Sequence, residues 1–428
     1  MRFALINPPW SFEGSIYFGC REPHLPLEFG YAKLLLEQQG QEVLLLDAHL
    51  QGLTAEEVYR QVCDYQPEVI AVPTAPTYLF WRCPPPELRV PQTLFRKLRE
   101  IPAKLIAVGP HGSTTPQTAL KKLKVDAVIL GECEEVLAEL AAGIENASSI
   151  AYLEADGVVI RGPNRATDLK KLPALRWPDL LLARHSHHHH RFDGAPRGPG
   201  AEMEASRGCP YHCTFCAKEN FRNRYRKRPL EIILAEVDQF IAQGVEYIYF
   251  IDEIFLPDAA LLAALSERPL KIGVQTRIDL WNEESIRALA RAGCVSIEAG
   301  IESISENGRA YLDKKCKLST EQLTERLVFA RELIPFVQGN LLAMAEDDAE
   351  AVERWREELQ RKGVWANQPV PLFPYPGSPE YTRRWGAPDE LAWERAHASY
   401  LQAFAAFSDI QEQQPQSLVD LENACYGC

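Results

Sequence analysis

Residues 207–216 read RGCPYHCTFC and place three cysteines, Cys209, Cys213 and Cys216, within eight residues. Thiolates spaced so closely on one loop can hold one face of a cubane iron–sulfur cluster and leave its fourth iron without a protein ligand. An open coordination position lets a substrate bind at the metal, which is typical of catalytic sites. The alternative is a structural zinc ion, for which His212 would have to supply the fourth ligand, and the spacing favours the cluster.

A repeated strand and helix pattern surrounds this loop. Amphipathic segments predict helices at Leu230–Gln243, Glu283–Ala292 and Thr320–Glu332. Short apolar runs predict strands at Met203–Ala205, Tyr247–Ile251, Lys271–Val274, Val295–Ile297, Val337–Leu341 and Val370–Phe373. Such β-α units predict a complete or partial TIM-type barrel of parallel strands over residues 201–380, with its chemistry at the carboxyl ends of the strands.

Residues 1–150 show a second alternation of strands and helices. A helix is predicted at Leu27–Gln39, closed by Gly40, and strands at Phe3–Ile6, Val43–Leu46, Val69–Val72, Leu105–Val108 and Ala127–Leu130. Apolar strands separated by helices indicate a Rossmann-like, doubly wound parallel sheet, so the chain belongs to the α/β class. Because ligands bind beyond the carboxyl ends of such strands, the candidate contacts are Asn7–Trp10, Asp47–Gly52, Thr74–Thr77, Gly109–Thr115 and Gly131-Glu132.

Two other segments differ in composition. Residues 151–200 contain five prolines and a histidine run, His185 and His187–His190, and are predicted to form a linker. The run lacks the spacing of one metal geometry, so a solvated loop is favoured over a metal site. Residues 381–428 are predicted to be helical and to end in a loose polar tail, where Cys425 and Cys428 form a pair too small to hold a cluster alone.

Length and composition limit the class of protein. The chain has 428 residues, which indicates two or three domains, and its net charge of −13 disfavours a nucleic-acid partner. No apolar run approaches the roughly 18 residues of a membrane span, and no signal peptide is recognisable, so we expect a cytoplasmic protein without a membrane partner. The odd number of eleven cysteines, spread over a long chain, excludes a disulfide framework.

The Cys-x3-Cys-x2-Cys motif after a first strand resembles that of the radical S-adenosylmethionine (SAM) superfamily. The resemblance implies that Cys209, Cys213 and Cys216 hold a 4Fe-4S cluster whose open iron chelates the methionine part of SAM. Reduction of the cluster then cleaves SAM to a 5′-deoxyadenosyl radical, with electrons from an external donor such as flavodoxin or ferredoxin. An aromatic residue before the last cysteine, here Phe215, is typical of the superfamily.

Further matches to the superfamily stand at the predicted strand ends. Asp252 and Glu253 follow the second barrel strand, where the resemblance places acceptors for the methionine ammonium. Gln275 and Arg277 follow the third strand, and Arg277 can pair with the methionine carboxylate or with a substrate acid. Asp252, Glu253 and Arg277 are therefore the expected catalytic residues, against the alternative that each acid is a surface or helix-capping carboxylate.

Two more segments carry a resemblance. The first is similar to a segment of the superfamily, and the second to a segment of its cobalamin-binding branch. Gly300 and Glu302 belong to a stretch similar to its Gly-Ile-Glu-Ser segment, where Gly300 admits the backbone near the adenosine. Pro374–Pro379 resembles the segment that closes the barrel in the cobalamin-binding branch.

The N-terminal domain resembles the cobalamin-binding domain of that branch over its whole length. The matching pieces are Asn7-Pro8-Pro9, Gly109-Pro110-His111 and Val125–Glu132. The resemblance implies cofactor contacts from Asn7, Pro8, Thr74, Gly109, His111, Gly131 and Glu132. Residues 47–52 also fit Asp-x-His-x-x-Gly, a motif whose histidine ligates cobalt in other cobalamin enzymes. Here the motif follows the second strand and not the first, so we interpret His49 as a coincidental match. The lower face of the cobalt is then left to Thr74-Ala75-Pro76 or to water.

A basic run follows the cysteine loop, and it includes Arg222, Arg224, Arg226, Lys227 and Arg228. It is interpreted as a solvated stretch, with a contact to an anionic substrate or to SAM as the alternative.

The resemblance implies a cobalamin-dependent radical SAM enzyme, with a methyltransferase acting on an unreactive carbon through the 5′-deoxyadenosyl radical and methylcobalamin as the main hypothesis. In that hypothesis the two cofactors lie on either side of a small-molecule substrate. The alternatives are a cyclase, oxidase or rearrangement enzyme with the same cofactors, or a non-catalytic metal-binding module.

Overall fold

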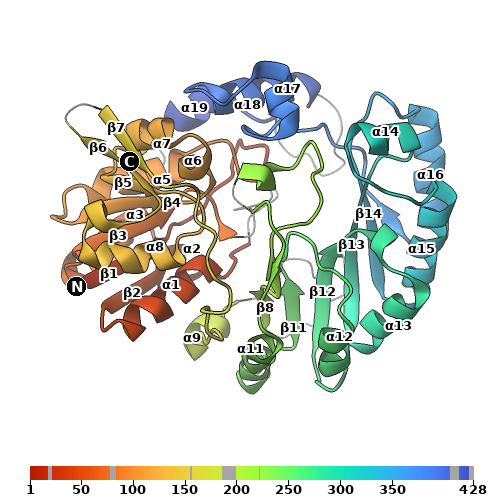
Figure 1. The fold of residues 1–428 in the computed structure, drawn as a ribbon, viewed down its shortest axis with the longest axis horizontal. Helices are drawn as coiled ribbons and strands as arrows, with labels where there is room; N and C mark the ends of the chain where they lie inside the picture. The colour runs from red at the N-terminus through yellow and green to blue at the C-terminus, as the bar shows by residue number, and fades with distance from the viewer. Residues whose placement is uncertain are drawn as a thin grey trace.

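The computed structural model describes residues 1–17, 22–77, 83–154, 157–185, 199–220, 222–404 and 414–423. Two domains, each built on its own sheet, lie side by side, and a C-terminal helical segment crosses above both (Figure 1). Within the described residues, no helix is long and apolar enough to cross a membrane.

The first sheet has the strand order β2-β1-β3-β4-β5-β6-β7 within the described residues. Its parallel strands match the predicted ones: β1 (Arg2–Asn7), β2 (Glu42–Asp47), β3 (Val69–Pro73), β4 (Lys104–Val108) and β5 (Ala127–Ile129). The sheet continues as an antiparallel hairpin of β6 (Ile150–Glu154) and β7 (Gly157–Arg161). The predicted domain boundary at residue 150 therefore falls at the start of a strand, and part of the segment 151–200 belongs to this sheet.

Helices cover both faces of the first sheet, as expected for a doubly wound fold. One face packs on α1 (Leu27–Gln38) and α8 (Glu134–Glu139), and the other on α3 (Ala55–Tyr65), α5 (Arg89–Leu98) and α7 (Pro116–Leu123). Short helices α2 (Ala48–Gln51) and α6 (Pro110–Thr114) follow β2 and β4. The chain reverses its winding direction between β1 and β3, the position where ligands bind in such sheets.

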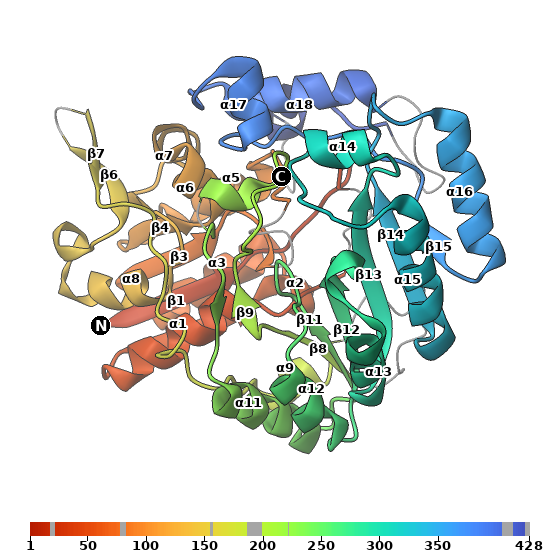
Figure 2. The same cartoon turned by 45° about the vertical axis from the view of Figure 1, so that its right-hand side comes forward.

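The second sheet is a partial barrel of parallel strands (Figure 2). Its strands are β8 (Gly200–Met203), β11 (Tyr247–Phe250), β12 (Lys271–Thr276), β13 (Cys294–Glu302), β14 (Phe336–Leu341) and β15 (Trp365–Ala366). The outer helices are α11 (Leu230–Ala242), α12 (Ala259–Ser266), α13 (Glu283–Arg291), α15 (Thr320–Leu333) and α16 (Ala349–Arg361). Strands β8 and β15 are edges in the described residues, so the barrel is open.

Two predicted barrel strands are misplaced. The first strand runs over Gly200–Met203 and not over Met203–Ala205. Glu202 interrupts the apolar pattern of this strand, although its side chain is buried and lies next to two histidines. Val370–Phe373 is not a strand: Val370 forms one isolated bridge, to Leu342. Prolines at 369, 371 and 374 remove the N–H donors that a strand needs.

The C-terminal segment holds the two domains together. It contains α17 (Pro379–Trp385), α18 (Ala392–Ala403) and α19 (Leu418–Asn423). Trp393 donates from Nε1 to Thr115 Oγ1 over 3.0 Å, and its ring lies 4.3 Å from that of His111. The predicted loose tail is wrong for residues 414–423, since Gln416 bonds Gly14 and Leu421 is fully buried.

The remaining short elements lie in the connections. They are α9 (Asp179–Leu182), α14 (Glu306–Tyr311), the two-residue strands β9 (Ser206–Arg207) and β10 (Arg226–Lys227), and 3-10 helices at Leu140–Ala142, Ile144–Asn146, Ala217–Asn220 and Ile278–Leu280.

Candidate functional site

The cysteine loop leaves β9 at the carboxyl end of the barrel. Gly208 opens it with a φ of +78°, and a Cβ there would lie 2.1 Å from the carbonyl oxygen of Arg224, so only glycine fits. Thr214 fixes the loop from both sides: its N–H donates to the Leu312 carbonyl, and its own carbonyl accepts from the Glu380 N–H. The loop is thus held between the barrel and the C-terminal segment.

The three thiols are free and partly buried. Burial raises the pKa of Cys209 and Cys216 and raises that of Cys213 to about 11, while Lys314 and Arg277 favour the Cys213 thiolate. No group of three or more His, Cys, Asp or Glu among the described residues is arranged to hold a single metal ion. Each thiolate of a cubane site binds its own iron, so three partly buried thiols on one loop fit a cluster without converging on one point. Half-buried Phe215 lies between the last two cysteines.

Arg277 lies just beyond β12 and faces the cysteine loop. Its guanidinium carbon is 4.1 Å from the centre of the Tyr211 ring, and Nε and Nη2 donate to Asp279 over 3.1 and 2.7 Å. Burial disfavours the charged guanidinium, but the interaction with Asp279 is stronger than this effect and raises the pKa of Arg277. Nη1 is buried and has no hydrogen-bond partner among the described residues. This donor is therefore available to a carboxylate bound at the loop.

The end of β13 brings Glu302 and Lys314 next to Cys213. Lys314 Nζ donates to the Gly300 carbonyl over 2.9 Å and pairs with the Glu302 carboxylate. A Cβ on Gly300 would lie 2.5 Å from Glu302 Oε1, and Glu302 itself has a φ of +64°. Gln275, half-buried in β12, accepts from the Phe255 N–H through its carbonyl.

Asp252 and Glu253 bind protein groups on either side of the cysteine loop. Asp252 accepts from the Ala205 N–H over 2.9 Å and from the Ser206 hydroxyl, and burial raises its pKa to about 7. Glu253 accepts from the Gly208 N–H over 2.7 Å and from Arg222 Nη1 over 2.6 Å. Both acids therefore hold the cysteine loop on the barrel.

The switch point of the first sheet carries Asn7, Pro8 and Thr74, all buried. Asn7 donates to Asp47 Oδ1 and accepts from Trp10 Nε1, both over 2.8 Å. Thr74 Oγ1 is buried without a hydrogen-bond partner among the described residues. A mainly apolar cavity of about 440 Å³ lies beside this point, lined among others by Pro9, Ser11, Thr54, Val90 and Leu94.

Three other predicted cofactor contacts face the protein. His111 packs on Trp393, and burial lowers its pKa to about 3, so it is neutral. Gly131 lies against the backbone of Arg165 and donates to Ser113 Oγ over 2.8 Å. Gly109 is the N-cap residue before α6, with a φ of +119°, and its carbonyl accepts from the Ser113 hydroxyl.

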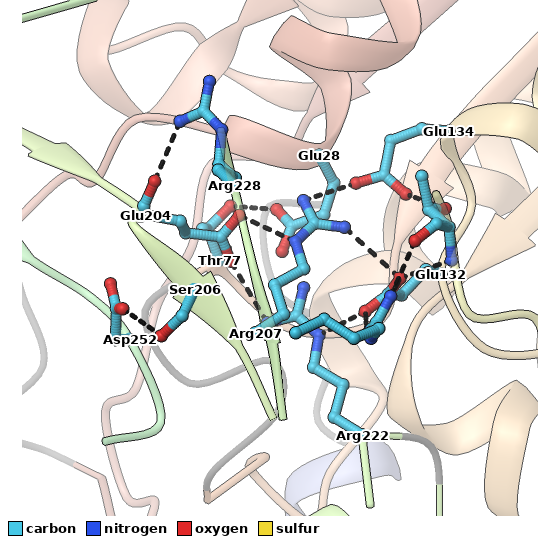
Figure 3. A network of polar contacts seen from close by, with 12 residues as sticks. Glu28, Thr77, Glu132, Glu134, Glu204, Ser206, Arg207, Arg222, Arg228 and Asp252 are labelled. Carbon is cyan, nitrogen blue, oxygen red and sulfur yellow. Dashed lines mark hydrogen bonds and ion pairs between the residues drawn. The ribbon is translucent and has the colours of Figure 1, made fainter. Parts of the chain in front are cut away.

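Glu132 lies in a buried network of charges between the domains (Figure 3). Its Oε1 accepts from Arg222 Nε over 2.9 Å and from Arg226 Nη2 over 2.6 Å. Its Oε2 accepts from the Thr167 N–H over 2.6 Å and from Arg226 Nη1 over 3.0 Å, with Arg207 Nη1 at 3.5 Å. Burial opposes ionisation, but Arg207, Arg222 and Arg226 outweigh it and lower the pKa to about 2.

The prediction that the basic run after the cysteine loop is solvated is wrong at three positions. Arg222 and Arg226 bind Glu132, and Arg228 donates to Glu236 over 2.7 Å. Sequence reasoning also missed four members of the network, because buried acids and arginines give no apolar periodicity: Glu28, Glu134, Glu204 and Arg207. The one available signal was that the acids stand close to predicted strand or helix ends.

The histidine run and the Asp-x-His-x-x-Gly segment are structural where described. His185 is buried, with Nε2 3.1 Å from Glu202, whose other oxygen lies 2.8 Å from His24 Nδ1, so the solvated interpretation is wrong for His185. Asp47 caps α2 through Leu50, and Gly52 ends it in the left-handed region. His49 therefore lies in a capped helical turn, and its interpretation as a coincidental match stays a prediction. His187–His190, Cys425 and Cys428 lie outside the described residues.

Residues 203–359 match the family described as the radical SAM superfamily. This part of the chain is a radical SAM domain. This match spans the cysteine loop and strands β11 to β14 of the barrel.

Relatives of this radical SAM protein cover both domains. An uncharacterized methyltransferase from Pyrococcus horikoshii is 23% identical over 90% of this chain and 82% of its own length. An anaerobic magnesium-protoporphyrin IX monomethyl ester cyclase from Synechocystis is 25% identical over 81% of this chain and 68% of its own. The radical SAM methyltransferase TsrM from Kitasatospora setae has a TM-score of 0.71 at 18% identity, over 90% of this chain and 76% of TsrM. The likeness to TsrM confirms the predicted two-domain fold.

Proposed function

We propose that this protein is a cobalamin-dependent radical SAM methyltransferase that acts on an unactivated carbon of a small molecule. The observation that carries the proposal is the meeting of two ligand-binding edges. Arg207 and Arg222 flank the cysteine loop at the carboxyl end of the barrel, and both contact Glu132, which lies shortly after β5 of the first sheet. Ligands bind at this edge in both kinds of sheet, so two cofactors can flank one substrate.

For the radical half, Cys209, Cys213 and Cys216 would hold a 4Fe-4S cluster, which supplies the electron that cleaves SAM when both are bound. Arg277 would bind the methionine carboxylate through Nη1, the donor that the protein leaves unpaired. Asp252 and Glu253 would keep the loop on the barrel. Gln275, Gly300, Glu302 and Phe215 line the same strand ends and loop and would contact the rest of SAM.

For the methyl-transfer half, Asn7, Pro8 and Thr74 would contact cobalamin, which carries a methyl group when bound. The unpaired Thr74 hydroxyl supports a polar ligand group at this point, and the cavity of about 440 Å³, whose lining includes Pro9, supports an apolar part of the ligand. A structure of TsrM was solved with cobalamin and a 4Fe-4S cluster bound, and the Pyrococcus relative is named a methyltransferase.

A second candidate keeps both cofactors without methyl transfer. The Synechocystis relative is named a cyclase and matches 81% of this chain, which supports ring formation as the alternative outcome.

We also propose a cytoplasmic location and an external electron donor such as flavodoxin or ferredoxin. The described cysteines outside the loop, such as Cys63 and Cys294, are free thiols, which suits a reducing compartment. A substrate-binding barrel with a single cluster loop needs electrons delivered from outside.

The test is anaerobic reconstitution of the full chain with iron, sulfide and cobalamin. The wild type and the control C63A should bind both cofactors, and C213A should lose iron. Incubation with methyl-labelled SAM and candidate substrates should then give a labelled product. Product without label would support the cyclase alternative, and a wild type that binds neither iron nor cobalamin would refute both.

A further inference from the structure

One carboxylate of the N-terminal domain contacts both ends of the cysteine loop. Arg207 stands just before the loop, on β9, and Arg222 follows it. Arg226 lies on β10, which pairs with β9. All three guanidinium groups reach Glu132, which follows β5 in the other domain, and Arg207 and Arg222 are almost fully buried. Glu132 therefore fixes the loop at its entrance and at its exit.

The same arginines continue the network into the barrel. Arg222 Nη1 lies 2.6 Å from Glu253 Oε1 and 3.1 Å from Glu204 Oε1, and Arg207 Nε donates to Glu204 over 2.8 Å. Glu253 in turn accepts from the Gly208 N–H, next to the first cysteine. A displacement of Glu132 is thus passed to the cysteine loop through three hydrogen-bonded contacts, from Glu132 to Arg222, from Arg222 to Glu253 and from Glu253 to the Gly208 N–H.

Charge balance makes this contact specific. A buried arginine needs a carboxylate, because an unpaired buried charge is costly. Glu134 also pairs with Arg207, over 2.6 Å, but Arg226 has no other carboxylate among its described ion pairs. Without the charge of Glu132, Arg226 would keep no carboxylate among its described ion pairs, and the barrel acids Glu204 and Glu253 would hold Arg222. Glu134 would then be the acid of the N-terminal domain that still pairs with Arg207.

We infer that Glu132 is a positioning residue that fixes the cysteine loop against the N-terminal domain and so sets the separation of the two proposed cofactors. The inference rests on the proposed function for the identity of those cofactors. It assigns Glu132 a role different from the cofactor contact expected from the sequence, since both of its oxygens are occupied by protein donors.

The test compares matched variants of the full chain. E132Q keeps the shape of the side chain and removes the charge between the domains, whereas E253Q removes a carboxylate that contacts the loop within the barrel. R268Q breaks the surface pair with Asp238 and serves as the control. If E132Q does not fold, R226K replaces it, because Arg226 is partly exposed and touches the network only at Glu132 and the Thr167 carbonyl among the described contacts.

Two measurements report the position of the loop. Pulsed EPR on the reduced cluster and cob(II)alamin should give a shifted or broadened separation in E132Q and an unchanged one in R268Q. Transfer of the SAM methyl group to added cob(I)alamin, kept reduced by a chemical reductant, gives methylcobalamin and S-adenosylhomocysteine. This reaction needs both domains and should slow by up to about 100-fold in E132Q. Formation of 5′-deoxyadenosine from SAM and dithionite needs the barrel alone and should change little. E253Q should impair both reactions.

The inference is overturned if E132Q leaves the EPR separation unchanged, or if it slows both reactions in parallel. Hydrogen exchange separates this failure from failure of the proposed function. If the wild type binds no cobalamin, the proposed function fails, and the inference is judged by the amides of residues 205–228. They should exchange faster in E132Q than in R268Q, and equal rates would refute the positioning role.

Discussion

The guanidinium of Arg277 stacks on the ring of Tyr211, with 4.1 Å between the guanidinium carbon and the ring centre. Tyr211 belongs to the cysteine loop and Arg277 to the end of β12, so this contact joins the loop to the barrel wall. Asp279 holds two of the three guanidinium nitrogens, which leaves Nη1 without a hydrogen-bond partner among the described residues. An arginine fixed on two sides binds a carboxylate with little loss of side-chain freedom.

Replacing Arg277 by lysine should weaken SAM binding by about 10-fold or more while the iron content stays unchanged, because a charged hydrogen bond is lost and lysine cannot stack in the same geometry. The dissociation constant of SAM can be followed through the change that SAM causes in the EPR spectrum of the reduced cluster. R268Q is the matched control, since Arg268 forms a bidentate pair with Asp238 on the surface. Unchanged affinity in R277K would argue against this role.

Asp252→Asn should remove a pH dependence of stability. Burial raises the pKa of Asp252 to about 7, although Ser206 and the Ala205 amide favour the charged form. Because the pKa in the unfolded chain is about 3.9, folding favours the protonated carboxyl, and its contribution is fully present below about pH 4 and lost as the pH rises to 7. The wild type should therefore lose up to about 4 kcal/mol relative to D252N between pH 4 and pH 8.

Urea unfolding of the metal-free protein at a series of pH values measures this difference. The amide oxygen that D252N introduces can still accept from the Ala205 N–H, so the two proteins differ mainly in charge. A difference in unfolding free energy that is the same at pH 4 and pH 8 would show that Asp252 does not titrate in this range.

Glu202→Gln should destabilise the protein most at mildly acidic pH. Burial opposes the charges, but His185 and His24 lower the pKa of Glu202 well below its usual range, and Glu202 raises the pKa of His185. The contribution of the Glu202 carboxylate to the free energy of unfolding is present above about pH 4.5 and is lost as the pH falls through its lowered pKa. The contribution of His185 is present below about pH 6.5 and is lost as the pH rises through its raised pKa. Both contributions to the free energy of unfolding are complete between about pH 4.5 and about pH 6.5.

The loss of unfolding free energy in E202Q should be about 3 kcal/mol near pH 5.5, because one partner of a buried pair is removed, and smaller at pH 9. Thermal unfolding at the two pH values, with the wild type alongside, gives the comparison. A loss that grows toward pH 9 would contradict the ion pair.

The parts of the fold that follow apolar periodicity could be predicted from the sequence, and the buried polar contacts could not. All five parallel strands of the first sheet are confirmed, because each is a buried apolar run. The misplaced β8 contains Glu202, which is buried beside His185 and beside His24, a residue far away in the sequence. Glu132 is a second case in which the sequence does not show the contact: its neighbours in sequence indicate a ligand-binding edge, but the arginines that pair with it come from the other domain.

Gly131→Ala should destabilise the protein far more than Gly244→Ala, although both glycines have a positive φ. At Gly131, a Cβ would lie 2.4 Å from the backbone nitrogen and oxygen of Arg165, while at Gly244 nothing lies within 4 Å. G244A should cost about 1–2 kcal/mol for the left-handed backbone alone, and G131A about 1–3 kcal/mol more, because the obstructing atoms belong to the backbone and cannot rotate away. Urea unfolding of the two variants tests this, and equal losses would show that Gly131 is not held against Arg165. Since Glu132 is the next residue, G131A should also loosen the contact between the domains, visible as faster hydrogen exchange in residues 205–228, whereas G244A should leave that exchange unchanged.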